Sequence, residues 1–175
     1  MNSSHTNDDF TMDELKKSIK HLKNNKAPGP DGIPVEAIKS SPDFVLEILL
    51  KLLNKIKRQG CFPTKWGMGI TTLLHKTGDT TDPNNYRPIT VTNSMSKILN
   101  SILNNRLSNW ISEKKLLCKE QIGFQRDSRP SDHLFVLKTL IDCHKNANKK
   151  LFICFVDFEK AFDSVWREGM FHKLL

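Results

Sequence analysis

Apolar residues recur at the spacing of an amphipathic helix in four stretches of the chain, and each stretch begins with residues that cap helices. Thr11 and Glu14 have the spacing of a capping box ahead of the first stretch, which ends near Asn24. Gly60 ends the second stretch. The predicted helix starts are Thr11, Ser41–Asp43, Thr92 or Asn93, and Ser131–Asp132. The residues predicted to face the core are Met12, Leu15, Ile19 and Leu22, then Phe44, Val45, Ile48, Leu49, Leu52, Leu53 and Ile56, then Met95, Ile98, Leu99, Ile102, Leu103, Leu107, Trp110 and Ile111, and finally Leu134, Leu137, Leu140 and Ile141.

Two extended stretches between the second and third helices predict a β-hairpin with a long tip. Residues 69–76 and 86–91 favour strands, and residues 77–85 are rich in turn formers. Lys76 and Arg87 then flank the hairpin. Two cations on facing strands can hold a phosphate, although exposed edge strands also carry solvated cations.

A run of six apolar residues, Leu151 to Val156, predicts a strand that is buried on both faces. Asp157 follows it directly, at the sheet edge where α/β sheets place their sites. A buried carboxylate there needs a cation as partner. The pattern fits a cation site and an ordinary turn equally well.

The Pro-Gly and Asp-Gly turns within residues 26–34 predict a loop between the first two helices. This composition fits two kinds of loop equally well. One is an ordinary connection between helices, and the other is a loop whose backbone approaches a phosphate chain beside Lys26.

Composition narrows the choice of partners. The chain has 175 residues, enough for one core and part of a second, and a formal net charge of +8 that favours a polyanion. The four cysteines lack zinc-site spacing and indicate reduced thiols of an intracellular protein, in nucleus or cytoplasm. His133 and His144 are too far apart to share a metal. No secretory signal region and no apolar run of membrane-spanning length occurs, so we expect no membrane partner.

Five blocks of the chain, in this order, resemble the reverse transcriptases of non-LTR (LINE-type) retrotransposons. The blocks are Lys26–Gly32, Trp66–Asp79, Asn85–Thr90, Gln121–Phe124 with Asp132-His133, and Phe155–Val165. Each block is weak alone, but five in the family order are specific. Group II intron maturases share part of the pattern and are the nearest alternative family.

The resemblance implies an α+β fold: the fingers and partial palm of a right-hand polymerase, helix-rich with a β-hairpin and a truncated palm sheet. We expect a disordered tail at 1–10, a fingers-like region at 11–148, and the start of the palm at 149–175. The palm strands that would pair with the Leu151 strand belong to later parts of this family's domain, so this strand can lack a partner and become an aggregation hazard.

The resemblance also implies the site. Asp157 matches the first catalytic aspartate, and with the carbonyl of Phe158 it would bind Mg²⁺ in a two-metal site. Lys76 and Arg87 match the cations that hold the incoming deoxynucleoside triphosphate. Phe162 matches the bulky residue that excludes a 2′-hydroxyl. The RNA template, paired with a DNA primer, would follow the loop residues Lys26, Gly29, Pro30, Asp31 and Gly32.

The family's paired catalytic aspartates have no counterpart in this sequence, and Asp163 is expected to stabilise the turn that follows Phe162. We therefore expect the 175-residue chain alone not to polymerise, with activity belonging to a longer product. A non-catalytic nucleic-acid-binding remnant is the alternative. No obligate protein partner is indicated.

Overall fold

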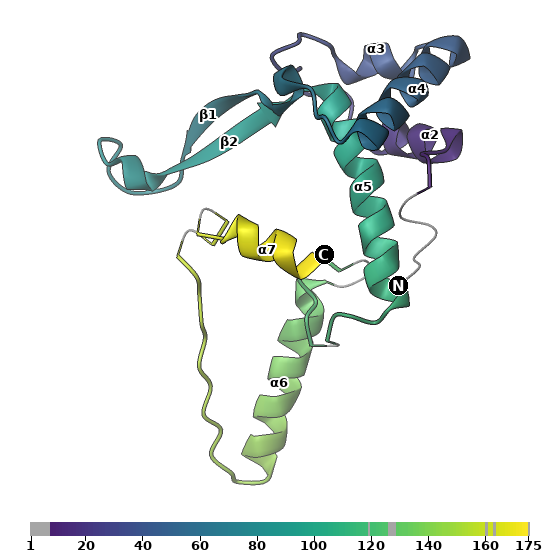
Figure 1. Cartoon of the computed structure of the whole chain (residues 1–175). Helices are drawn as coiled ribbons and strands as arrows, with labels where there is room; N and C mark the ends of the chain where they lie inside the picture. Colours follow the sequence, from purple (N-terminus) through teal and green to yellow (C-terminus); the bar gives the residue numbers. More distant parts are fainter. Residues whose placement is uncertain (1–7, 119, 126–128, 160, 163, 175) are drawn as a thin grey trace. The chain divides into compact units, whose positions relative to one another are not determined.

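The computed structural model describes residues 8–118, 120–125, 129–159, 161–162 and 164–174. The chain divides into two compact units, Met1–Leu117 and Cys118–Leu175. The first unit contains α2 (Met12–His21), α3 (Val35–Lys39), α4 (Asp43–Gln59), the 3₁₀ turn η1 (Thr64–Gly67), β1 (Gly69–His75), the 3₁₀ turn η2 (Pro83–Asn85), β2 (Tyr86–Thr92) and α5 (Ser94–Glu113) (Figure 1). The second contains α6 (Pro130–Asn146) and α7 (Arg167–Leu174). The described chain is thus helix-rich with one antiparallel two-stranded sheet.

The core of the first unit lies between its four helices. Its buried members are Phe10, Leu15, Ile19, Ile38, Leu46, Leu49, Leu53, Ile56, Ile98, Leu99 and Ile102. The prediction that Phe44, Ile48 and Leu52 face the core is wrong, because all three are exposed on α4. The apolar arc of this helix is wider than the face that its neighbours cover.

The predicted start of α2 is confirmed in detail. The N–H of Glu14 donates to the Thr11 hydroxyl at 3.3 Å, and the Thr11 N–H donates to the Glu14 carboxylate at 2.8 Å. Both donors lack helical partners, so this exchange fixes the first turn. The end of α4 is also as predicted, since Gly60 adopts the left-handed conformation with φ 64°.

Residues 8–10 are predicted to be part of a disordered tail at 1–10, but they contact the helices of the first unit. Phe10 is 3% exposed, and its main chain bonds to the side chain of Asn54. The Phe10 N–H donates to Asn54 Oδ1 at 2.6 Å, and Asn54 Nδ2 donates to the Phe10 carbonyl at 3.1 Å. Residues 1–7 lie outside the described residues.

Arg106 joins α5 to the start of α2. Its guanidinium meets the Glu14 carboxylate in a fork, with Nε–Oε1 at 2.6 Å and Nη2–Oε2 at 2.9 Å. It also donates to the carbonyls of Asp8 and Asp9 and lies 4.8 Å from the centre of the Phe10 ring. The Arg106 hydrogen bond is the main reason why the pKa of Glu14 lies below its usual value.

The predicted hairpin forms, with Gly69 opposite Thr92 at its base and His75 opposite Tyr86 at its far end. Figure 1 shows the two strands extending away from the helices of the first unit. Every residue of β1 is exposed. Pro88 lies opposite Leu73, at a position whose missing N–H faces away from β1, so it breaks no bond of the ladder.

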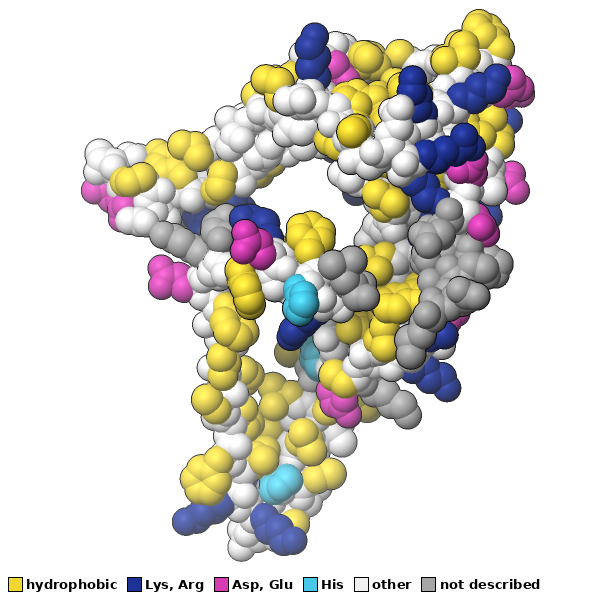
Figure 2. All heavy atoms as spheres, viewed as in Figure 1, with side chains coloured by type: hydrophobic (Ala, Val, Ile, Leu, Met, Phe, Trp, Pro, Cys, Tyr) yellow, Lys and Arg dark blue, Asp and Glu magenta, His cyan; other side chains and the backbone are white. Residues whose placement is uncertain are grey.

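In the second unit the predicted strand at 151–156 is wrong. Residues 149–158 form neither helix nor strand, and Phe152 is 89% exposed. A strand needs a hydrogen-bonded neighbour, and the described residues supply none here. Hydrophobic side chains are visible along this segment in Figure 2. The fourth helix forms as α6, but none of its residues is buried, so its predicted inward face is wrong too.

Candidate functional site

Lys76 and Arg87 occupy one face of the hairpin. Arg87 pairs with Leu74 in the register, and the Lys76 N–H donates to the Asn85 carbonyl at 2.8 Å, which continues the register by one pair. Side chains two residues apart share a strand face, so Lys76 lies beside Leu74 and diagonal to Arg87. Diagonal positions are separated by roughly 7–8 Å, a span that two long cationic side chains can close around one anion.

The hairpin tip is held by its own side chains. Asp79 accepts the N–H of Thr81 at 2.8 Å, a bond that lowers the pKa of Asp79. Asn85 Nδ2 donates to the Asp79 carbonyl at 2.9 Å, and the Tyr86 hydroxyl donates to the Thr80 carbonyl at 2.8 Å. These bonds order the turn that lies between Lys76 and Arg87. The backbone positions of both cations are therefore fixed on the tip side.

The loop between α2 and α3 contains a tight turn. The Gly32 N–H donates to the Gly29 carbonyl at 3.0 Å, and Gly32 has φ 68°, which glycine adopts without strain. The Asp31 carboxylate accepts the Ile33 N–H at 3.2 Å. Gly29 is buried. The exposed residues among those predicted to contact a template are Lys26, Pro30, Asp31 and Gly32.

Asn93 joins this loop to the base of the hairpin. It is 2% exposed, and its Oδ1 accepts the Asp31 N–H at 3.2 Å while its Nδ2 donates to the Lys65 carbonyl at 2.7 Å. A Cβ on Gly29 would lie 2.7 Å from both Cα and N of Asn93, so only glycine allows this approach. The sequence predicts Asn93 only as one of two possible helix caps, yet its side chain makes none of the cap bonds.

Asp157 lies in the second unit, in the extended segment after Val156, and is exposed. Phe158 follows it and is exposed as well. Among the described residues, no group of three His, Cys, Asp or Glu side chains could hold a metal ion. The donors fit Mg²⁺ in kind, because a carboxylate and a backbone carbonyl are hard oxygen ligands, but they form only part of a coordination shell.

Phe162 packs edge-to-face on Phe124, with ring centres 6.3 Å apart and planes at 86°. This contact joins two of the resembling blocks within the second unit. Both rings stay largely exposed, so the Phe162 ring has a face open to a ligand. Lys160 and Asp163, the latter expected to stabilise the adjacent turn, lie outside the described residues.

Residues 74–175, which include the hairpin cations, Asp157 and Phe162, match the model of the family "Reverse transcriptase (RNA-dependent DNA polymerase)". The chain belongs to this family. Its relatives place it among the reverse transcriptases of non-LTR retrotransposons.

The relatives match almost the whole chain. The RNA-directed DNA polymerase from mobile element jockey of Drosophila melanogaster is 32% identical over 165 residues, which cover 93% of this chain and 18% of the relative. The Pol polyprotein from type-1 retrotransposable element R2 of Popillia japonica is 32% identical over 161 residues, covering 92% and 21%. The probable RNA-directed DNA polymerase from transposon BS of Drosophila melanogaster is 29% identical, covering 93% and 18%. The chain thus spans about a fifth of the length of these relatives.

Two further findings bear on partners. The family copies RNA into DNA from nucleotide substrates and generally uses Mg²⁺. In the described part of the chain, no helix is both long enough and apolar enough to cross a membrane.

Proposed function

We propose that this chain forms the fingers and the first part of the palm of an RNA-directed DNA polymerase that adds deoxynucleotides to a primer 3′-hydroxyl on an RNA template. The shared hairpin face of Lys76 and Arg87 is the observation that carries the proposal. An incoming triphosphate carries several negative oxygens. Two cations on one face of a formed hairpin can bind these oxygens without a rearrangement of the backbone.

Each of the two cations has its own task. The planar guanidinium of Arg87 can bind two phosphate oxygens at once, whereas the ammonium of Lys76 acts as a point charge. On the palm side, the Asp157 carboxylate and the Phe158 carbonyl would hold Mg²⁺, which supplies charge stabilisation to the attacking and leaving oxygens. The open face of the Phe162 ring would lie under the sugar and reject a 2′-hydroxyl.

The template loop acts in two ways. Lys26 and the turn at Pro30 are exposed and can face the template backbone. Gly29 is buried against Asn93, so its part in template binding would be to position the loop. The hydrogen bond from the Asp31 N–H to Asn93 links the loop to the hairpin base. It would thereby couple the position of the template on the loop to the position of the nucleotide on the hairpin.

The test is nucleotide binding by the 175-residue chain. Lys76→Ala and Arg87→Ala should each weaken binding of a fluorescent deoxynucleoside triphosphate by about tenfold or more, because a charge-assisted hydrogen bond contributes about 1.5–3 kcal/mol. Arg87→Lys should recover only part of the affinity. Lys51→Ala, an exposed lysine on α4, is the matched control. Equal affinities in all variants with unchanged circular dichroism would overturn the assignment.

A further inference from the structure

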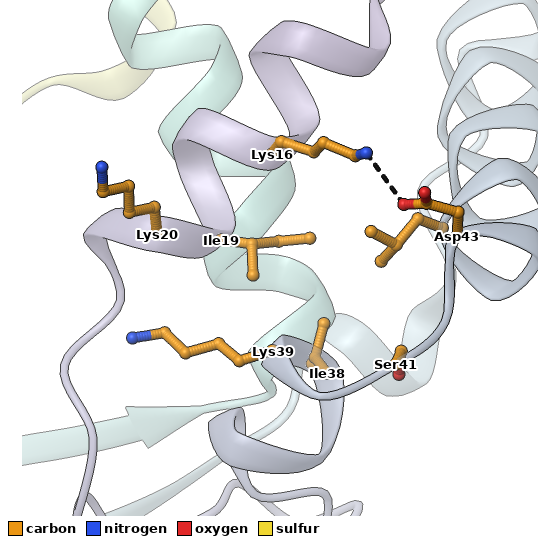
Figure 3. A pocket seen from close by; sticks show the side chains of 8 residues that line it. Lys16, Ile19, Lys20, Ile38, Lys39, Ser41 and Asp43 are labelled. Atoms are coloured by element: carbon orange, nitrogen blue, oxygen red, sulfur yellow. Dashed lines mark ion pairs between the residues drawn. The ribbon is translucent and has the colours of Figure 1, made fainter.

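A pocket in the first unit lies between α2, α3 and the start of α4. Its volume is about 390 Å³, within the 300–1,000 Å³ range typical of ligand sites. The lining residues are Lys16, Ile19, Lys20, Ile38, Lys39, Ser41, Asp43 and Leu46. Figure 3 shows Ile19 and Ile38 pointing into its centre, with the lysines around them. The pocket therefore combines an apolar floor with a cationic rim.

The rim retains unused hydrogen-bond donors. An ammonium group has three. Lys16 uses one on the Asp43 carboxylate at 2.8 Å. Lys39 uses two, on the Leu22 carbonyl at 2.6 Å and Asn24 Oδ1 at 2.7 Å. The Lys20 side chain forms no hydrogen bond or ion pair with any described residue. With three cations and one anion, the rim favours a negatively charged ligand.

The pocket also adjoins the template loop. Lys39 holds Leu22 and Asn24 at the point where the chain leaves α2, and the Asn25 N–H donates to the Glu36 carboxylate at 2.5 Å. The loop then runs from Lys26 to α3, which forms another wall of the pocket. Residues 16–26 contain five lysines and no acidic residue, so the segment that joins the pocket to the loop is basic.

We propose that this pocket binds one nucleotide unit of single-stranded RNA, with the backbone phosphate on Lys20 and Lys16 and the ribose or base on Ile19 and Ile38. This inference rests on the proposed function, because the RNA is the template that passes the loop. A phosphate alone would not need the apolar floor, and an apolar ligand would not need the lysines.

The experiment measures the affinity of the chain for a fluorescent 20-nucleotide RNA by anisotropy. Lys20→Glu should weaken binding about tenfold or more. It should also reduce the slope of log affinity against log salt by about 0.7, the value for one phosphate contact on a single strand. Lys17→Glu is the matched control, because Lys17 lies on the same helix outside the pocket and the variant has the same net charge. Lys20→Arg should keep the affinity.

A gain of affinity gives a second test. Asp43→Asn releases Lys16 from its ion pair, so RNA binding should tighten by several-fold. The methyl NMR signals of Ile19 and Ile38 should shift when RNA is added and stay in place with inorganic phosphate at equal concentration. Shifts with phosphate alone and none with RNA would overturn the assignment to nucleic acid.

The outcomes separate the two proposals. Equal loss of affinity in Lys20→Glu and Lys17→Glu would refute the pocket and leave the hairpin assignment standing, since it is tested by triphosphate binding. Absence of salt-dependent RNA binding by the wild-type chain would overturn the pocket and the template role of the loop together.

Discussion

Replacement of Gly29 by Ala should destabilise the first unit more than the same change at Gly32. The added Cβ at position 29 would meet Asn93 Oδ1 at 2.6 Å and the Asn93 Cα and N at 2.7 Å. Overpacking of this kind costs about 1–3 kcal/mol. The loop must move away from Asn93, so the hydrogen bond from Asp31 to Asn93 is also lost. Its loss lowers the free energy of unfolding by about 0.5–1.5 kcal/mol. The expected total is about 1.5–4.5 kcal/mol.

Gly32→Ala is the matched control. Position 32 has open space around it, and its φ of 68° imposes only a conformational cost, about 1 kcal/mol. Position 29 thus tests a steric contact, and position 32 tests backbone conformation alone.

The assay is urea unfolding followed by tryptophan fluorescence in a Trp166→Phe background. Trp66 and Trp110 then report on the first unit without the signal of the second. Asn93→Ala should not rescue Gly29→Ala, because the clash with the Asn93 main chain remains. A Gly29→Ala variant that is as stable as Gly32→Ala, with equal m-values, would refute the close approach.

Two further predictions concern the N-terminal contacts of the first unit. The pKa of Glu14 is lowered in the folded state, so its contribution to stability is present above the unfolded pKa of about 4.3 and is lost as pH falls through the folded value. Thermal melts of Glu14→Gln should therefore show a weaker loss of stability between pH 6 and pH 3 than wild type, and identical profiles would contradict the role of Arg106. Asn54→Leu leaves the N–H and carbonyl of Phe10 buried without partners, at about 1–3 kcal/mol each. Chemical denaturation should show a lower midpoint, and protection of the Phe10 amide from hydrogen exchange should fall.

Local signals in the sequence predicted local structure well. The capping box at Thr11, the left-handed Gly60 and the hairpin between residues 69 and 92 each depend on neighbours in the chain or on one adjoining strand. Their geometry follows from steric and hydrogen-bonding rules that act over a few residues.

Long-range polar contacts were not predictable. Arg106 and Glu14 are 92 residues apart, and Asn93 and Asp31 are 62 apart. From the sequence, such polar residues are predicted to be surface residues or helix caps, because the periodicity of apolar residues shows only which side of an element is apolar. Only the packing of α5 on α2 and on the loop gives these side chains their partners.

Apolar runs predicted burial that the structure does not show. The run at 151–156 has strand composition but no neighbouring strand among the residues that the structure describes, and Phe44 and Ile48 extend the apolar face of α4 beyond the reach of the core. Apolar content indicates what a segment can bury, whereas the available partners decide what it does bury.

The two outer edges of the hairpin differ. On the β2 side, Pro88 has no donor to offer, and the N–H of Tyr86 already bonds to the Pro83 carbonyl. On the β1 side, no proline interrupts the row from Gly69 to His75. A third strand, from any chain, would therefore find an uninterrupted row of outward N–H donors along β1, whereas β2 lacks donors at two of its outward positions, so the β1 edge is the better one for strand addition.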